Sequence, residues 1–115
     1  MSGKRILGVD PGQSGGLAII QGGALVIGTR MPIIKIRGKA QLDARAVLEW
    51  WWGVAFDVAV IEAVHAMPRQ GVTSSFQFGR MLGAIESLVF SVGVPVHYVT
   101  PAAWKKAMGL SSDKQ

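Results

Sequence analysis

The sequence contains no cysteine among its 115 residues. That absence excludes disulfide bonds and thiolate metal ligands, and it mildly favours a reducing compartment. No uncharged stretch is suited to crossing a membrane, because the longest one, Pro11–Thr29, is interrupted by glycines and glutamines. The N-terminal segment reaches Asp10 before the apolar core of a signal peptide could form. We therefore expect a cytoplasmic protein without membrane contacts.

Acidic residues are also scarce. Seven Asp and Glu stand against 12 Lys and Arg, which gives a formal net charge of +5. This excess suits a polyanionic partner such as nucleic acid, although an ordinary basic surface is the plainer alternative. Half of the residues are hydrophobic and 15 are glycine, a composition typical of a globular protein with many tight turns. We expect residues 1–115 to form one domain.

Two of the few acidic residues stand at the ends of apolar strands. Asp10 closes the run Ile6–Val9 and precedes Pro-Gly, and Glu62 directly follows Asp57–Ile61. A carboxylate at the end of a buried strand is costly to desolvate unless it has a partner. Carboxylate oxygens are the ligands that hard divalent cations prefer, so the pair predicts a metal site built across a sheet. The alternative is that Asp10 caps the Pro-Gly turn and Glu62 is a solvated strand end.

The hydrophobic pattern predicts an α/β fold with the element order β-β-β-α-β-α-β-α. Three hairpin-connected strands, followed by strands joined through helices, predict a mixed five-stranded sheet flanked by helices. The first strand should be central and the fourth should return parallel to it. Asp10 and Glu62 would then meet at the carboxyl edge of the sheet. Pro32 suggests an edge position or a bulge within the third strand. The expected strands are Arg5–Asp10, Gly16–Gln21, Ala24–Ile36, Asp57–Glu62 and Val94–Val99, and the expected helices are Ala40–Gly53, Ser74–Val92 and one from Thr100 to Gly109.

Four segments carry a resemblance to a known family. They are GVDPGQSGGLAII (Gly8–Ile20), VAVIEAVHA (Val58–Ala66), FGRMLGAI (Phe78–Ile85) and PVHYVTPAAWKKAMG (Pro95–Gly109). In this order and spacing the chain resembles the RuvC-like Holliday junction resolvases of the RNase H-like (retroviral integrase) superfamily, especially the versions found in phages and prophages. The resemblance implies an RNase H-like fold and a homodimer that resolves branched DNA as a structure-selective endonuclease.

The resemblance also implies a catalytic site with divalent metal. Asp10 and Glu62 would be its catalytic ligands for Mg²⁺ or Mn²⁺, with two ions in a complete site. The family's remaining acidic ligands lie on a helix after the fifth strand, whereas this chain stops at Ser111–Gln115 with only Asp113 in that stretch. We therefore expect a domain that is incomplete at its C-terminus, lacks the last helix of the fold and cleaves poorly.

Basic residues are the candidates for DNA binding. Lys35, Arg37 and Lys39 alternate in KIRGK, so on an extended strand they would share one face and could follow a phosphate backbone. Lysines that protect an edge strand from aggregation are an equal alternative. His65 takes the position at which the family carries an aromatic wedge, and a plain loop histidine is the alternative reading. Further candidates are Arg69, Arg80, Lys105 and Lys106.

The long predicted helix offers a dimer interface. Gly79 and Gly83 share one of its faces and, together with Phe78 and Leu82, could allow close approach of a second copy. The same stripe could instead pack on the sheet. On the preceding helix, Trp50–Trp52 cannot all point inward, so we expect at least one of these indoles to be partly exposed or to be buried by a partner.

Two other functions stay open at this point. The first is a non-catalytic module that binds branched DNA or assembles with other proteins, which the number of carboxylates would distinguish. The second is a phosphate-binding hairpin like that of the actin and sugar-kinase ATPases, since glycine-rich turns can hold phosphate. Those proteins need two such domains around a nucleotide, and 115 residues leave no room for them. We therefore expect no nucleotide cofactor.

Overall fold

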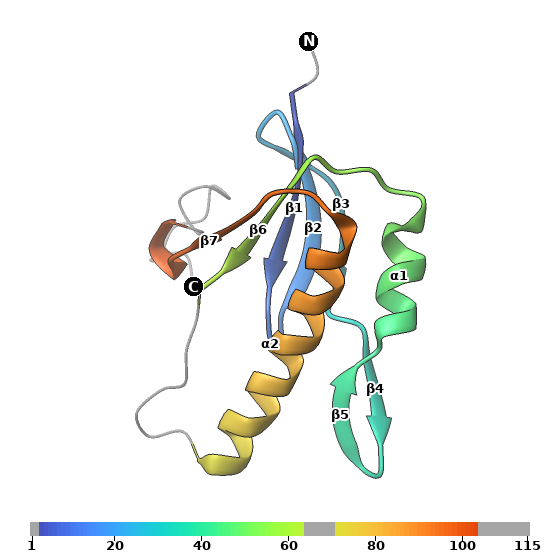
Figure 1. Ribbon diagram of the computed structural model, residues 1–115, viewed down its shortest axis with the longest axis vertical. Helices are drawn as coiled ribbons and strands as arrows, with labels where there is room; N and C mark the ends of the chain where they lie inside the picture. Colours follow the sequence, from blue (N-terminus) through green and yellow to red (C-terminus); the bar gives the residue numbers. More distant parts are fainter. Residues whose placement is uncertain (1–2, 64–70, 104–115) are drawn as a thin grey trace.

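The computed structural model describes residues 3–63 and 71–103. Its centre is a mixed five-stranded sheet with the strand order β3-β2-β1-β6-β7 (Figure 1). Strands β1, β2 and β3 are antiparallel neighbours, whereas β6 runs parallel to both β1 and β7. The predicted central position of the first strand and the parallel return of the strand that ends at Glu62 are both confirmed. The strands span Arg5–Asp10 (β1), Gly16–Gln21 (β2), Ala24–Arg30 (β3), Val58–Glu62 (β6) and Val96–Val99 (β7).

The expected third strand, Ala24–Ile36, is wrong in its second half. Strand β3 ends at Arg30, and the chain then forms a separate two-stranded ribbon from β4 (Ile33–Ile36) and β5 (Lys39–Leu42). Pro32 lies at the break, where it has no N–H to continue a ladder. The ribbon reverses at Arg37 and Gly38, whose φ angles are 54° and 77°, and two positive φ angles in a row are what a tight hairpin turn requires.

Two helices accompany the sheet. Helix α1 (Ala44–Trp52) begins later than expected, because the residues before Asp43 pair as β5. Asp43 caps it by accepting a hydrogen bond from the Ala46 N–H at 3.1 Å. Helix α2 (Val72–Val92) ends at Gly93, whose φ of 92° is the left-handed conformation common after helices. Within the described ranges, neither helix is long and apolar enough to cross a membrane.

After β7, Thr100 caps a further helical start, with the Ala103 N–H donating to its Oγ1 at 3.1 Å. This agrees with the predicted N-cap. The predicted end of that helix at Gly109 lies outside the described residues.

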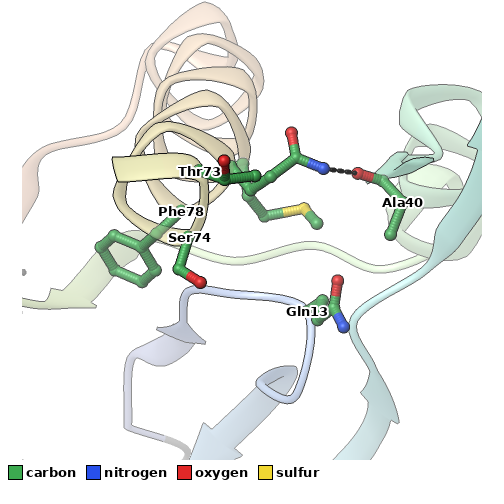
Figure 2. A pocket seen from close by; sticks show the side chains of 7 residues that line it. Gln13, Ala40, Thr73, Ser74 and Phe78 are labelled. Carbon is green, nitrogen blue, oxygen red and sulfur yellow. Dashed lines mark hydrogen bonds between the residues drawn. The ribbon is translucent and has the colours of Figure 1, made fainter. Parts of the chain in front are cut away.

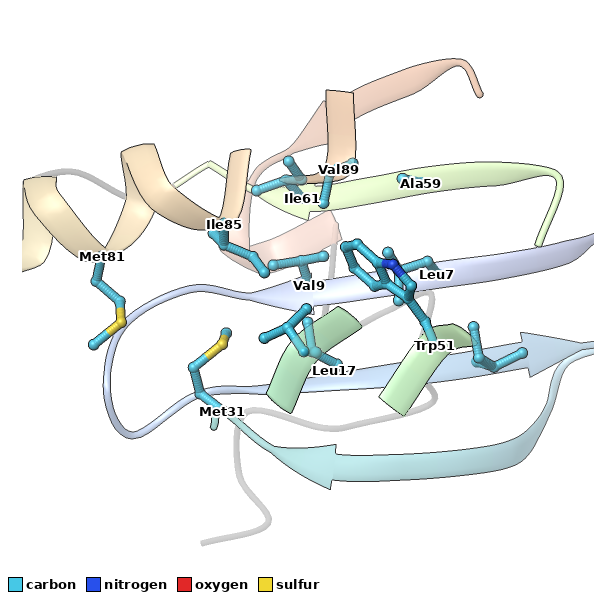
Figure 3. Close-up of a cluster of buried hydrophobic side chains, with 12 residues drawn as sticks. Leu7, Val9, Leu17, Met31, Trp51, Ala59, Ile61, Met81, Ile85 and Val89 are labelled. Atoms are coloured by element: carbon cyan, nitrogen blue, oxygen red, sulfur yellow. The ribbon is translucent and has the colours of Figure 1, made fainter. Parts of the chain in front are cut away.

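Both helices pack on the same face of the sheet, where they close a single apolar core (Figure 3). Leu7, Val9 and Ile61 are fully buried in it, and each such side chain contributes about 1.5–3 kcal/mol by leaving water. The tryptophans divide as expected, since Trp51 is 7% exposed and Trp52 is 86% exposed. The other members of the core are Leu17, Ile19, Met31, Val47, Ala59, Met81, Ile85 and Val89.

Candidate active site

Strands β1 and β6 bring the two predicted carboxylates together. Their parallel register pairs Val9 with Ile61, so Asp10 and Glu62 occupy the next row, at the same end of the sheet. Side chains alternate along a strand. Because Val9 and Ile61 are fully buried against the helices, the following residues belong to the opposite face. The predicted meeting of these residues at the carboxyl edge is thus reproduced, while their role as metal ligands stays a prediction.

The glycine-rich turn after β1 holds the backbone of Asp10 tightly. A Cβ added at Gly15 would lie 1.8 Å from the Asp10 carbonyl oxygen, a distance that no side chain permits. The Gly15 N–H donates to the Gly12 carbonyl at 3.1 Å, and the Gly15 carbonyl accepts from the Met31 N–H at 3.0 Å. Glycine at position 15 is therefore a requirement of the close packing around Asp10.

Burial differs between the two carboxylates. Glu62 is 9% exposed and Asp10 is half-buried. Their oxygen atoms suit a hard divalent cation, and two carboxylates supply part of its coordination sphere. Among the residues that the structure describes, no group of three or more His, Cys, Asp or Glu is placed to hold a metal ion. Asp10 and Glu62 thus form a pair of carboxylates that no third such residue completes within the described ranges.

Tyr98, which is not part of the Asp10 and Glu62 pair, has a raised pKa. Its hydroxyl donates to Glu86 Oε2 at 2.5 Å and thereby ties β7 to α2. Burial raises the pKa of Tyr98 to about 12, and the hydrogen bond to Glu86 and the negative charge of that residue add to the effect. Tyr98 pairs with Ile61 and so lies in the helix-covered row of the sheet. Its shift therefore concerns the stability of the fold and not the candidate site.

The predicted row of cations in KIRGK is wrong. Arg37 occupies the hairpin turn, while Lys35 stands opposite Ala40 and Lys39 stands opposite Ile36. Since residues that face each other across a ladder share a face and neighbours in a strand alternate, Lys35 and Lys39 lie on opposite faces of the ribbon. All three side chains are exposed, but they form no continuous line.

Arg80 is exposed on α2, and its guanidinium carbon lies 5.7 Å from the centre of the Phe76 ring. This distance is within the range of a cation–π contact. The other predicted DNA-binding residues, His65, Arg69, Lys105 and Lys106, lie outside the described residues.

The four residues expected at a dimer interface face in two directions. Gly79 and Gly83 are exposed, and an added Cβ at either would meet no atom within 4 Å. Leu82 instead packs against the core, and the Phe78 ring lies 3.4 Å from a Cβ built on Gly12. Only the glycine pair therefore offers an open surface, and its use in a dimer stays a prediction.

The structure adds a hollow that sequence reasoning missed. A space of about 310 Å³ opens between the start of α2, β5 and the glycine-rich turn, with Gln13 opposite Thr73 and Ser74 (Figure 2). Across it, Gln77 Nε2 donates to the Ala40 carbonyl at 3.4 Å. Small polar residues at the start of a helix are usually read as caps, so no signal in the sequence connects them with a turn 60 residues earlier.

Comparisons with known proteins agree with this architecture. No protein-family model matches the sequence. The chain is 30% identical over 115 residues to the crossover junction endodeoxyribonuclease RuvC of Corynebacterium efficiens and equally to that of Corynebacterium glutamicum, covering 92% of this chain and 51% of each relative. It therefore spans about half the length of the curated relatives it matches. These relatives confirm the resemblance to RuvC, while the phage or prophage type stays a prediction.

Two solved structures share the fold. One is Thermus thermophilus RuvC in complex with a Holliday junction substrate, with a TM-score of 0.66 and 19% identity over 97% of this chain and 83% of the other. A second T. thermophilus RuvC structure matches with a TM-score of 0.59 and 17% identity, over 100% of this chain and 84% of the other. The expected RNase H-like fold is confirmed.

Proposed function

We propose that this chain, which is RuvC-like in sequence and in fold, is a structure-selective endonuclease that hydrolyses phosphodiester bonds in branched DNA. The observation that carries the proposal is the shared row of Asp10 and Glu62, set by the parallel register of β1 and β6. The relatives are crossover junction endonucleases by name, and one structure with this fold is a complex with a Holliday junction. A Holliday junction is accordingly the substrate that we propose.

The carboxylates would hold divalent metal, Mg²⁺ or Mn²⁺, with two ions in a complete site. When bound, such ions supply an activated water and stabilise the leaving oxygen of the phosphodiester. Asp10 stands closer to the sheet centre, on β1, and the packing of Gly15 against its carbonyl limits how far its backbone can move. Glu62 is buried and therefore poorly hydrated, which strengthens its attraction for a cation. Asp10 and Glu62 are the residues that would hold these ions.

Net charge and symmetry support the proposed partners. A formal charge of +5 favours binding to the phosphate backbone. A four-way junction with two-fold symmetry is best matched by an isologous homodimer. The open glycine pair on α2, Gly79 and Gly83, is the proposed contact. Light scattering on wild type and Gly83→Leu tests it, since a dimer that persists in the variant would place the interface elsewhere.

The test is cleavage of a labelled four-way junction, with a linear duplex of the same sequence as the control substrate. Wild type should cut the junction only when Mg²⁺ or Mn²⁺ is present. Asp10→Asn and Glu62→Gln keep the side-chain shape but remove the charge, so each should lower the cutting rate by at least about 100-fold. Glu49→Gln removes an exposed carboxylate on α1 and should change nothing. Equal rates in wild type and Asp10→Asn would refute the proposal.

One observation favours a second function. Because the described residues contain no third acidic ligand beside Asp10 and Glu62, the chain could bind branched DNA without cutting it. Titration calorimetry with Mn²⁺ distinguishes the two functions. An endonuclease should bind Mn²⁺ and lose this binding in Asp10→Asn, whereas a non-catalytic module should bind the junction but show no Mn²⁺ binding that depends on Asp10.

A further inference from the structure

The hollow beside the glycine-rich turn is built from parts of the molecule that meet only in the fold. Gln13 comes from the turn that follows Asp10, Ala40 comes from β5, and the other lining residues come from the first three turns of α2 (Figure 2). Its volume of about 310 Å³ is within the range of small-molecule binding sites. The turn that contributes Gln13 is the one that packs on the Asp10 carbonyl through Gly15. The hollow therefore lies beside the turn that follows Asp10, on the side of the sheet that α2 covers.

Its lining is uncharged and more apolar than polar, with Ala40, Phe78 and Met81 among its residues. Two amides, from Gln13 and Gln77, and two hydroxyls, from Thr73 and Ser74, supply both hydrogen-bond donors and acceptors. The Phe78 ring adds a flat apolar surface. A phosphate group would call for cations, and none of the residues that line this hollow carries a charge. A neutral, planar group with its own donors and acceptors fits this lining better.

Charge appears in the neighbouring hollow. A second space of about 350 Å³ shares Thr73 and Gln77 with the first and is also lined by Lys39 and Arg80. Phe76 lies there too, in contact with the Arg80 guanidinium. Lysine and arginine are the side chains that neutralise DNA phosphates. The first space is uncharged and suits a base, whereas the second carries positive charge and suits a phosphate. The two adjoining spaces thus match the two parts of a single nucleotide.

We propose that the uncharged hollow holds one unstacked nucleobase of the DNA, at the branch point next to the bond that is cut, while Lys39 and Arg80 contact the adjoining phosphates. Glutamine amides and serine or threonine hydroxyls recognise base edges by hydrogen bonds, and aromatic rings stack on bases. The hollow would therefore set which base the protein prefers at this position. This inference rests on the proposed function, because it presumes that branched DNA is the ligand.

The experiment measures binding of the full chain to five labelled four-way junctions without divalent metal, so that no cutting occurs. The junctions are identical except at one branch-point nucleotide, which is A, C, G, T or abasic. Wild type should bind its preferred base at least about fivefold more tightly than the abasic site, which is the lower end of the effect of a good base contact. In the double variant Gln13→Ala/Ser74→Ala this difference should fall below about twofold.

The matched control is the double variant Gln21→Ala/Ser87→Ala. It removes the same two groups elsewhere, since Gln21 donates to the Gly3 carbonyl and Ser87 donates to the Gly83 carbonyl. Its base preference should equal that of wild type. Lys39→Ala and Arg80→Ala should instead weaken all five junctions alike, and each should reduce the salt dependence of log K by about one unit.

Each outcome has a distinct meaning. If wild type binds none of the junctions, the proposed function fails and the inference fails with it. If wild type binds all five equally, or if the Gln13→Ala/Ser74→Ala variant keeps the full preference, the base-binding role of the hollow is wrong and the proposed function stands. Circular dichroism confirms folding of the variants. A fluorescent base analogue at the branch point gives a readout that needs no variant, because its emission should change when wild-type protein unstacks it.

Discussion

The two faces of the central sheet differ in what covers them. On one face, Leu7, Val9 and Ile61 are fully buried under α1 and α2. On the other face, which neither α1 nor α2 covers, Ile6, Val58 and Val60 are only half-buried, and Asp10 and Glu62 end the row. Neighbouring residues of the same strands thus serve different purposes. The comparison teaches that the face under α1 and α2 stabilises the fold, while the opposite face, as far as the described residues show, carries the two candidate carboxylates.

The largest expected effect comes from two adjacent isoleucines in β2. Ile19 is fully buried beside Leu7, whereas Ile20 lies beside Ile6 on the other face and is half-buried. Ile19→Ala should lower the free energy of unfolding by about 2–5 kcal/mol, because it leaves a cavity in the core. Ile20→Ala should cost less than half as much. Urea unfolding of both variants measures this difference, and equal losses would show that the second face is as tightly packed as the first.

A smaller effect is expected at the edge that carries the carboxylates. Gly15→Ala would force its new methyl group into the Asp10 carbonyl, so the turn must shift. We expect a loss of about 1–3 kcal/mol in the free energy of unfolding and weaker Mn²⁺ binding by calorimetry. Gly53→Ala is the control, because its φ of −95° suits other residues and open space surrounds it after α1. Alanine there should change the free energy of unfolding by less than about 0.5 kcal/mol and leave Mn²⁺ binding as in wild type. Unchanged Mn²⁺ binding in Gly15→Ala would show that the turn does not influence the candidate metal site.

The smallest effect concerns Tyr98 on the covered face. Its pKa is raised to about 12 in the folded protein, whereas an unfolded tyrosine titrates near 10. The folded state therefore binds the proton more tightly, and the resulting stability is fully present below about pH 10 and is lost as the pH rises toward 12. Urea unfolding from pH 9 to 12 should show that the free energy of unfolding of wild type declines. This decline should be shallower in Tyr98→Phe. The effect should be small because Tyr98 is 48% exposed, and identical slopes would mean that folding does not raise the pKa of Tyr98.

Patterns along the chain predicted the sheet well, because its strands have clear hydrophobic signals and sharp turns. The ends of β1 and β2 agree with expectation, and those of β6 differ by one residue at Asp57. The Asp57 side chain accepts a hydrogen bond from the Arg5 N–H at 2.9 Å, while its own N–H donates to the Arg5 carbonyl at 2.8 Å. The parallel return of β6 followed from the crossover through a helix. The pairing of Asp10 with Glu62 could therefore be predicted without coordinates.

The ribbon could not be predicted in the same way. Alternation in KIRGK is compatible both with one long strand and with a hairpin, and only the backbone angles of Arg37 and Gly38 distinguish them. The consequences reach the helix that follows, since pairing of β5 with β4 delays the start of α1 until Asp43 can cap it. Local propensity left the choice open, and packing of β5 beside α2 decided it.

The sequence by itself determined the carboxylates at the strand ends and the apolar stripe of α2, because each depends on neighbours close along the chain. Only the tertiary structure decided that Gln13, Thr73 and Ser74 line one hollow, and that Lys35 and Lys39 face opposite ways. The physical reason is that periodicity specifies which side of an element is buried. What that element meets depends on contacts between residues far apart in the chain.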